Sequence, residues 1–219
     1  EVTRLSNDVF TMDKILLGDV FIRGGSSSGT HVLEEGRPIG QFYGLVCNGI
    51  DENGRYIMVD KDGDGEISDP ADYDYIGSAQ PKLTYGITNT FRYKNFDLSF
   101  FLRGTIGNDI LNATRMAYAQ SGFLPGTNAL DDPLTYTLSE TPRFSNYYLE
   151  KGSFMRLDNL TLGYKIKALN GIRVYFTAQN LFVITKYKGL DPEVPMDSGD
   201  GLTPGVEPRE FYPKARTFS

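Results

Sequence analysis

The sequence predicts an all-β fold of antiparallel strands that form part of a transmembrane β-barrel with long extracellular loops. Two observations lead to this prediction. Strand-like segments alternate strongly between apolar and polar residues, and their connections are short at one end and long at the other. Successive residues of a strand point to opposite faces, so the alternation separates an apolar surface from a polar one. Strands of about ten residues with this asymmetry of connections are typical of outer-membrane barrels.

The alternation is clearest in residues 81–94, 96–104, 154–166 and 172–185. The turns at 94–95 and 167–171 are tight, so each flanking pair of strands is expected to form an antiparallel hairpin. The predicted lipid-facing residues are Leu83, Tyr85, Ile87, Leu98, Phe100, Leu160, Leu162, Val174 and Phe176. The predicted inward residues are Thr84, Arg92, Arg103, Arg173 and Gln179, and for Arg103, Arg156 and Arg173 internal ion pairing is the expected role.

A soluble sandwich also alternates, because one face of its sheet packs on a core while the other meets water. The connections over 105–152 and 186–213 favour the barrel, since structureless loops beyond about 15 residues are uncommon in compact domains. A soluble all-β module that binds calcium or carbohydrate remains the alternative, because an Asp-rich loop and aromatic strands would suit it too.

Composition excludes several classes of protein. The net charge of −6 argues against a nucleic-acid partner, whose phosphates call for basic patches. A single cysteine, Cys47, excludes an internal disulfide framework and a multi-cysteine metal site, and a buried, unreactive thiol is its expected role. The only histidine, His31, has no His or Cys at ligand spacing, so a surface or hydrogen-bonded role is expected rather than catalysis.

The remaining segments are less regular. Residues 19–23, 30–33 and 39–46 are expected to be strand pieces, and a short helix is expected over 108–120. Glycine-rich stretches at 24–29 and 198–201 indicate loops or turns.

One segment, 60–67, has the spacing of metal ligands. It reads D-K-D-G-D-G-E-I, with carboxylates at the first, third and fifth positions of a calcium loop and glycine at the sixth. Position twelve, where a bidentate Glu belongs, is Ala71, and the preceding residues are strand-like, so a true EF-hand is not expected. An acidic turn without metal is the alternative to a divalent-cation site, most plausibly for Ca²⁺. The candidate ligands are Asp60, Asp62, Asp64, Glu66, Asp69 and Asp72.

Several segments together resemble the SusC/RagA family of TonB-dependent outer-membrane transporters. The landmarks are E-G-R-P-I-G-Q-F-Y-G at 35–44, the acidic segment at 60–67, I-G-S-A-Q-P at 76–81, G-S-F-M-R-L-D-N-L-T-L-G-Y at 152–164, Q-N-L-F-V-I-T-K-Y-K-G-L-D-P-E at 179–193 and Y-P-K-A-R-T-F at 212–218. They occur in the family's order over nearly the whole chain.

This resemblance implies that residues 1–219 are the C-terminal segment of a large barrel of the 22-stranded type, with the plug domain and most strands upstream and the closing strand incomplete. It implies a bacterial outer-membrane location, no enzymatic activity, and uptake of oligosaccharides or peptides. The implied partners are a SusD-like surface lipoprotein, outer-membrane lipid, and TonB, which would be contacted through upstream segments. On this topology the turns at 94–95 and 167–171 are periplasmic, and residues 49–79, 105–152 and 186–212 lie outside the cell.

Overall fold

The computed structural model describes residues 14–22, 25–122, 124–126, 128–169, 171–193, 201–207 and 212–219. The chain divides into two compact units made of interleaved segments. The sheet unit comprises residues 81–107, 151–192 and 212–219, and the loop unit comprises residues 1–80, 108–150 and 193–211. Each unit is described by itself.

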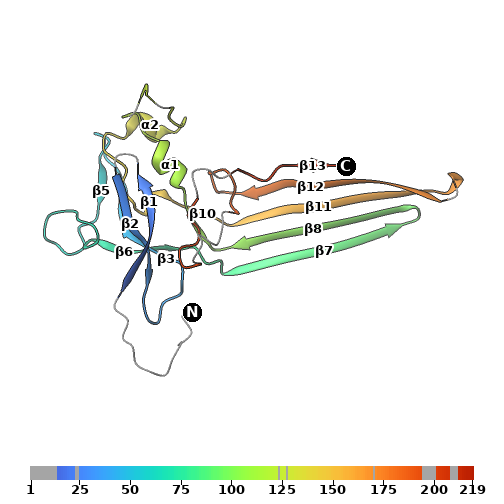
Figure 1. Cartoon of the computed structure of the whole chain (residues 1–219), viewed down its shortest axis with the longest axis horizontal. Helices are drawn as coiled ribbons and strands as arrows, with labels where there is room; N and C mark the ends of the chain where they lie inside the picture. Colours follow the sequence, from blue (N-terminus) through green and yellow to red (C-terminus); the bar gives the residue numbers. More distant parts are fainter. Residues whose placement is uncertain are drawn as a thin grey trace. The chain divides into compact units, whose positions relative to one another are not determined.

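The sheet unit is one antiparallel sheet in the order β13-β12-β11-β8-β7. Figure 1 shows β7, β8, β11 and β12 as long strands lying side by side. Both predicted hairpins are confirmed, since β7 pairs with β8 and β11 pairs with β12 along their lengths. The strands are β7 (Leu83–Tyr93), β8 (Phe96–Ile106), β11 (Phe154–Ile166), β12 (Ile172–Thr185) and β13 (Thr217–Phe218), and a 3-10 turn, η2 (Lys167–Leu169), lies between β11 and β12.

The register places the predicted apolar residues on one face. Across the central strands, Leu98 lies opposite Leu162, and Leu162 lies opposite Phe176. Phe100, Leu160 and Ala178 form the next row, and β13 adds Phe218 beside Ala178. The predicted separation of faces is therefore confirmed.

A β-bulge in β11 keeps this face continuous. Leu157 and Leu160 are three residues apart, so a regular strand would point them to opposite faces. The register shifts between Leu157 and Asn159 against both β8 and β12, which makes Asp158 the extra residue opposite β8. Leu157 then lies opposite Leu102, and Leu160 opposite Phe100, on the same side of the sheet.

All connections to the loop unit leave the sheet at one end. Leu83 pairs with Ile106, Thr105 with Phe154, and Phe154 with Thr185, so these strand ends share one rim. The hairpin turns lie at the other rim. We refer to the two ends as the long-loop rim and the short-turn rim.

The loop unit contains a four-stranded antiparallel sheet in the order β1-β2-β3-β6 and two small two-stranded sheets, β4-β5 and β9-β10. Its strands are β1 (Ile15–Ile22), β2 (Gly25–Leu33), β3 (Gln41–Leu45), β4 (Cys47–Ile50), β5 (Tyr56–Met58), β6 (Tyr73–Ser78) and β9 (Asp109–Leu111), and β10 (Leu149–Lys151) begins in it. Its helices are α1 (Ala113–Tyr118), α2 (Pro133–Thr137) and the 3-10 turn η1 (Asn146–Tyr148).

Three predictions for this unit need correction. The glycine- and serine-rich stretch was expected to be a loop, yet Gly25 to Gly29 belong to β2, where Ser26, Ser27 and Ser28 pair with β1. Backbone pairing with β1 outweighs the weak strand propensity of glycine and serine. The helix expected over 108–120 is confined to α1, because 109–111 pair as β9 and the Asn112 side chain caps the helix by accepting from the Arg115 backbone N–H at 2.8 Å.

The third correction is that 105–152 is not structureless, since it contains β9, α1, α2, η1 and β10. In the expected turn at 198–201, only Gly201 is a described residue. None of the described helices is long and apolar enough to cross a bilayer.

An apolar core explains why the long connections form a compact unit. A cluster of buried side chains joins β3, β9, α1, α2 and the segment before β10. Its residues are Phe42, Ala79, Leu111, Ala113, Met116, Ala119, Leu134, Phe144 and Tyr148. Residues of β3, of the segment after β6 and of the long connection after β8 thus remove their apolar surface from water together.

Candidate functional site

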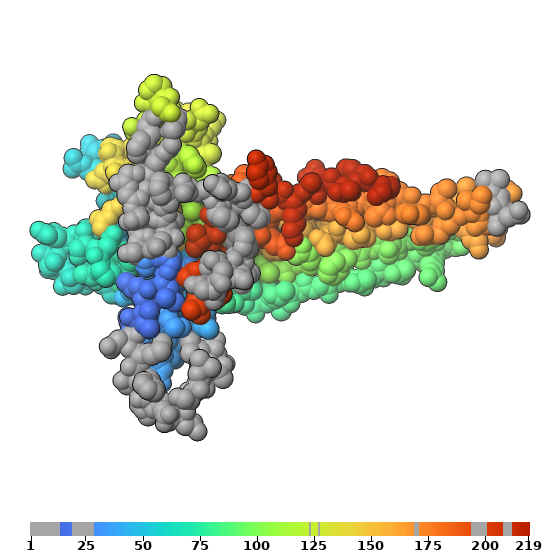
Figure 2. Space-filling view, viewed as in Figure 1, coloured from blue at the N-terminus to red at the C-terminus, as the bar shows by residue number. Residues whose placement is uncertain are grey.

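The apolar face of the sheet unit is exposed. Ile87 is 51% exposed, Val174 50% and Phe176 46%, although all three are large and apolar. In the space-filling view, the strands of this unit lie at the molecular surface along their length (Figure 2). A soluble sandwich would cover such a face with a second sheet, whereas a barrel turns it toward lipid.

The opposite face is polar and holds the predicted ion pairs. Arg173 of β12 forms two bonds to Asp97 of β8, with Nε–Oδ1 at 3.0 Å and Nη2–Oδ2 at 2.6 Å. This pair reaches across β11 above Gly163, where a Cβ would lie 2.5 Å from Arg173 Nη2. Arg103 pairs with the bulge residue Asp158 at 3.2 Å.

Arg156 forms a buried polar cluster close to the long-loop rim. Its side chain is 1% exposed, and Nη2 lies 2.5 Å from Asp191 Oδ1 of a carboxylate that is 4% exposed. Nη1 also donates to Asn180 Oδ1, and Asn180 Nδ2 donates to the Lys214 carbonyl at 2.6 Å. The cluster therefore ties β11 and β12 to Asp191 and to Lys214. These two residues lie before and after the loop-unit segment 193–211.

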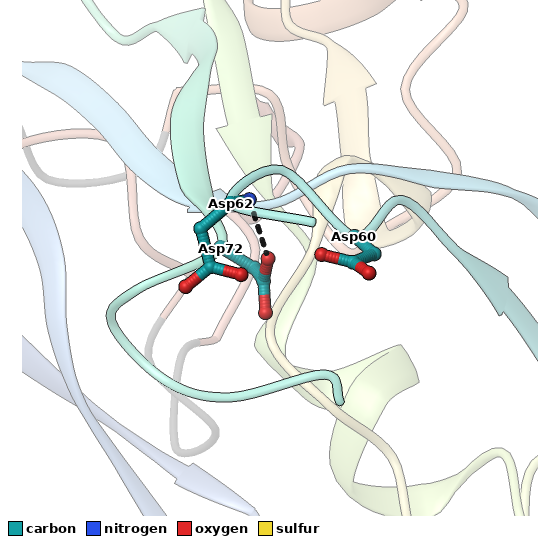
Figure 3. Close-up of side chains that lie close together, drawn as sticks. All are labelled: Asp60, Asp62 and Asp72. Atoms are coloured by element: carbon teal, nitrogen blue, oxygen red, sulfur yellow. Dashed lines mark hydrogen bonds between the residues drawn. The ribbon is translucent and has the colours of Figure 1, made fainter. Parts of the chain in front are cut away.

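The acidic loop brings part of the predicted ligand set together. Asp60, Asp62 and Asp72 each offer one carboxylate oxygen, and these oxygens lie within 4.8 Å of one another (Figure 3). The backbone folds around them: Asp60 accepts from the Gly63 and Gly65 N–H groups at 2.6 and 2.9 Å. Both glycines have positive φ, which their missing Cβ permits.

Electrostatics distinguishes two of these carboxylates. The backbone N–H of Asp64 favours ionised Asp62, but desolvation and the like charges on Asp64, Asp72 and Asp60 outweigh it, and the pKa of Asp62 is raised. The backbone N–H groups of Ser68 and Lys61 hold the pKa of Asp72 below its usual range. Three close carboxylates, one with a raised pKa, form an arrangement that a divalent cation would neutralise.

The other three predicted ligands lie outside this group. Asp64 instead accepts from the Glu66 backbone N–H at 2.8 Å, and Asp69 pairs with Arg143 at 2.8 Å. Asp72, one residue after the twelfth position at Ala71, provides the third carboxylate of the group.

The single cysteine and histidine have structural environments. Cys47 is buried, and burial raises the pKa of its thiol. His31 is fully buried, with Nδ1 2.9 Å from Thr30 Oγ1 and Nε2 2.9 Å from the Pro204 carbonyl oxygen. Since a carbonyl oxygen only accepts, Nε2 carries the proton, and the expected hydrogen-bonded role of His31 is confirmed.

Comparison with known proteins agrees with this architecture. No family model matches the chain. The TonB-dependent receptor P3 of Formosa agariphila is 33% identical over 87% of this chain and 22% of the relative. The TonB-dependent receptor SusC of Bacteroides thetaiotaomicron is 34% identical over 100% of this chain and 22% of the relative.

Solved structures give the same result. The chain superposes on the RagAB peptide transporter with a TM-score of 0.70 and 25% identity, over 95% of this chain and 24% of that one. The RagAB peptide importer in its "closed-closed" state gives a TM-score of 0.69 at 26% identity. The chain is a SusC/RagA-type C-terminal segment. It spans about a fifth of the length of the curated relatives it matches.

This SusC/RagA-type segment lies in the outer membrane, as SusC and RagA do, and its relatives are named as receptors or transporters rather than enzymes. The exposed apolar face of its sheet is accordingly the lipid face, and the polar face is the lumen face.

The partners of two residues in the SusC/RagA-type segment, Arg156 and His31, were not predicted from the sequence. Ion pairing was expected for Arg156, but its partner Asp191 was not identified. The signal was its place in the L-D-P-E motif shortly after β12. No sequence signal linked His31 to Pro204, 173 positions away.

Proposed function

We propose that the intact protein imports oligosaccharides or peptides across the outer membrane, energised by TonB and assisted by a SusD-like surface lipoprotein. The main support is a five-stranded sheet with one exposed apolar face and one ion-paired polar face. The whole of this chain matches part of SusC. A soluble calcium- or carbohydrate-binding module has no comparable support, because its sheet would bury the apolar face.

The asymmetry of the connections supports one orientation. Outer-membrane barrels have short turns on the periplasmic side and long loops outside. The short-turn rim is then periplasmic, and the long-loop rim faces the exterior. Residues 49–79, 105–152 and 186–212 are accordingly on the side where a surface lipoprotein and substrate are met.

Peptides are the substrate class with the more direct support, since RagAB is named a peptide transporter. A strain that lacks the gene is expected to lose uptake of the labelled substrate class and to regain it with the intact gene in a TonB-proficient background only. Uptake of peptide and oligosaccharide mixtures, measured in parallel, distinguishes the two classes. Restored uptake without TonB would contradict the proposal. Purification of the intact protein without an associated surface lipoprotein would contradict it too.

We also propose that Asp60, Asp62 and Asp72 bind one divalent cation, most plausibly Ca²⁺, that orders the acidic loop. All-oxygen ligands favour a hard cation, and the observation that supports the site is the convergence of three carboxylates from both ends of the loop. Asp64, Glu66 and Asp69 were predicted as ligands too, and would have to move to contribute. The cation would contribute structural order rather than catalysis.

Calorimetric titration of Ca²⁺ into the chelator-treated intact protein is expected to show binding that Asp60→Asn and Asp72→Asn remove. Because desolvation and like charges raise the pKa of Asp62, binding should strengthen as pH rises through that pKa and should release a proton where Asp62 is still protonated. Glu52→Gln, in the same long connection outside the cluster, is the matched control and should leave the heat unchanged. No heat at millimolar Ca²⁺ would leave only an acidic turn.

A further inference from the structure

The short-turn rim is strongly cationic although the chain as a whole is acidic. The two hairpin ends, residues 90–97 and 163–174, carry five cationic side chains and a single carboxylate, Asp97. Arg173 is paired with that carboxylate. The other cations are Arg92, Lys94, Lys165 and Lys167, all of them exposed.

Lys94 occupies a backbone conformation that does not suit lysine. Among the described non-glycine residues, two have positive φ, Asn180 at +50° and Lys94 at +54°. Asparagine tolerates the left-handed region, whereas an ordinary side chain is disfavoured there by the contact of its Cβ with the following carbonyl oxygen. The turn would be less strained with Gly or Asn at position 94 than with lysine. A conformation of this kind points to a functional constraint on the side chain.

The Lys94 side chain lies on the lipid side of the turn. Its Nζ is 5.2 Å from the centroid of the Tyr93 ring, and Tyr93 is 69% exposed on the lipid face. In the same row of the sheet, Phe96 lies opposite both Tyr93 and Tyr164, and the Phe96 and Tyr164 ring centroids are 4.6 Å apart. A row of aromatic side chains at the end of the apolar band is typical of the depth of lipid headgroups.

We propose that Lys94, with Tyr93, Phe96 and Tyr164, forms a binding site for the phosphate headgroup of an anionic glycerophospholipid in the periplasmic leaflet. The ammonium group supplies the charge for the phosphate, and the aromatic row marks the boundary between headgroup and acyl chains. Farther from the turn, the apolar rows from Phe91 and Leu98 to Ile87 and Leu102 provide a surface for the acyl chains. Charge complementarity selects an anionic lipid over a zwitterionic one, and the membrane-facing position selects a lipid over a soluble anion.

The binding test uses the intact protein in nanodiscs of phosphatidylcholine with increasing phosphatidylglycerol, with retained lipid counted by native mass spectrometry. Lys94→Asn is expected to weaken phosphatidylglycerol binding about fivefold, the effect of one surface cation near an anionic headgroup, and moderate salt should reduce the difference. Lys82→Asn removes the same charge at the long-loop rim and should leave binding unchanged.

Thermal unfolding provides the second measurement. In pure phosphatidylcholine, Lys94→Asn should be at least as stable as the parent protein, because asparagine tolerates the left-handed backbone conformation better than lysine. In phosphatidylglycerol that advantage in stability should shrink or reverse. Equal lipid retention by the parent and Lys94→Asn, or an equal loss in Lys82→Asn, would overturn the proposal. Since nanodiscs present both lipids to both rims, this outcome does not depend on transport or on orientation in the cell.

Discussion

Replacing Asp191 with Asn is expected to destabilise the folded protein by about 3–5 kcal/mol, because it removes one charged partner of a buried ion pair, the carboxylate that Arg156 Nη2 contacts. Asp191 and Arg156 are both almost inaccessible to water, so solvent cannot replace the lost carboxylate. Asparagine keeps the size of the side chain, which limits the change to charge. The measured quantity is the concentration of guanidinium chloride at which half of the intact protein has unfolded. Unfolding is followed by loss of the folded band on unboiled gels.

The matched control is Asp158→Asn, which removes a carboxylate that pairs with Arg103. That pair lies on the same face, but its side chains are 24% and 34% exposed, so the expected effect is below about 1 kcal/mol. Equal shifts for the two variants would show that burial does not determine the cost.

The second large effect concerns the lipid face. Leu160→Arg is expected to cost about 2–4 kcal/mol, since it places a charge near the middle of the bilayer, in the row of Phe100 and Ala178. Thr161→Arg, the next residue on the same strand, points to the lumen face and should cost much less. Folding yield and unfolding midpoint in vesicles provide the comparison, and similar losses at both positions would contradict the assignment of faces.

Alternation made the sheet unit predictable because a strand in a two-sided environment must repeat every two residues. Both hairpins, the faces of Leu83 and Arg173, and the tight turn at 94–95 followed from that period. The bulge at Asp158 was not predicted, because one extra residue does not change the composition of the strand. The sequence feature that indicated it was the odd spacing between Leu157 and Leu160.

The loop unit was less predictable because its contacts are between distant residues. Gly25–Leu33 has the composition of a loop, and pairing with β1 makes it a strand. The acidic loop revealed its carboxylates through spacing, yet selection of Asp72 over Asp64 depends on how 66–72 return toward Asp60. Such a return is set by tertiary contacts, among them the bond from Arg143 to Asp69.

The interleaving of the two units has a consequence for the order of folding. The loop unit combines segments from three separate parts of the chain, and His31 is bonded to a carbonyl 173 residues later. Contacts with such sequence separation form slowly, because a long loop must close before they are gained. The sheet hairpins, in contrast, need only neighbouring residues. During biogenesis the hairpins can therefore pair while the chain is being inserted, whereas the loop unit matures after residue 204 has arrived.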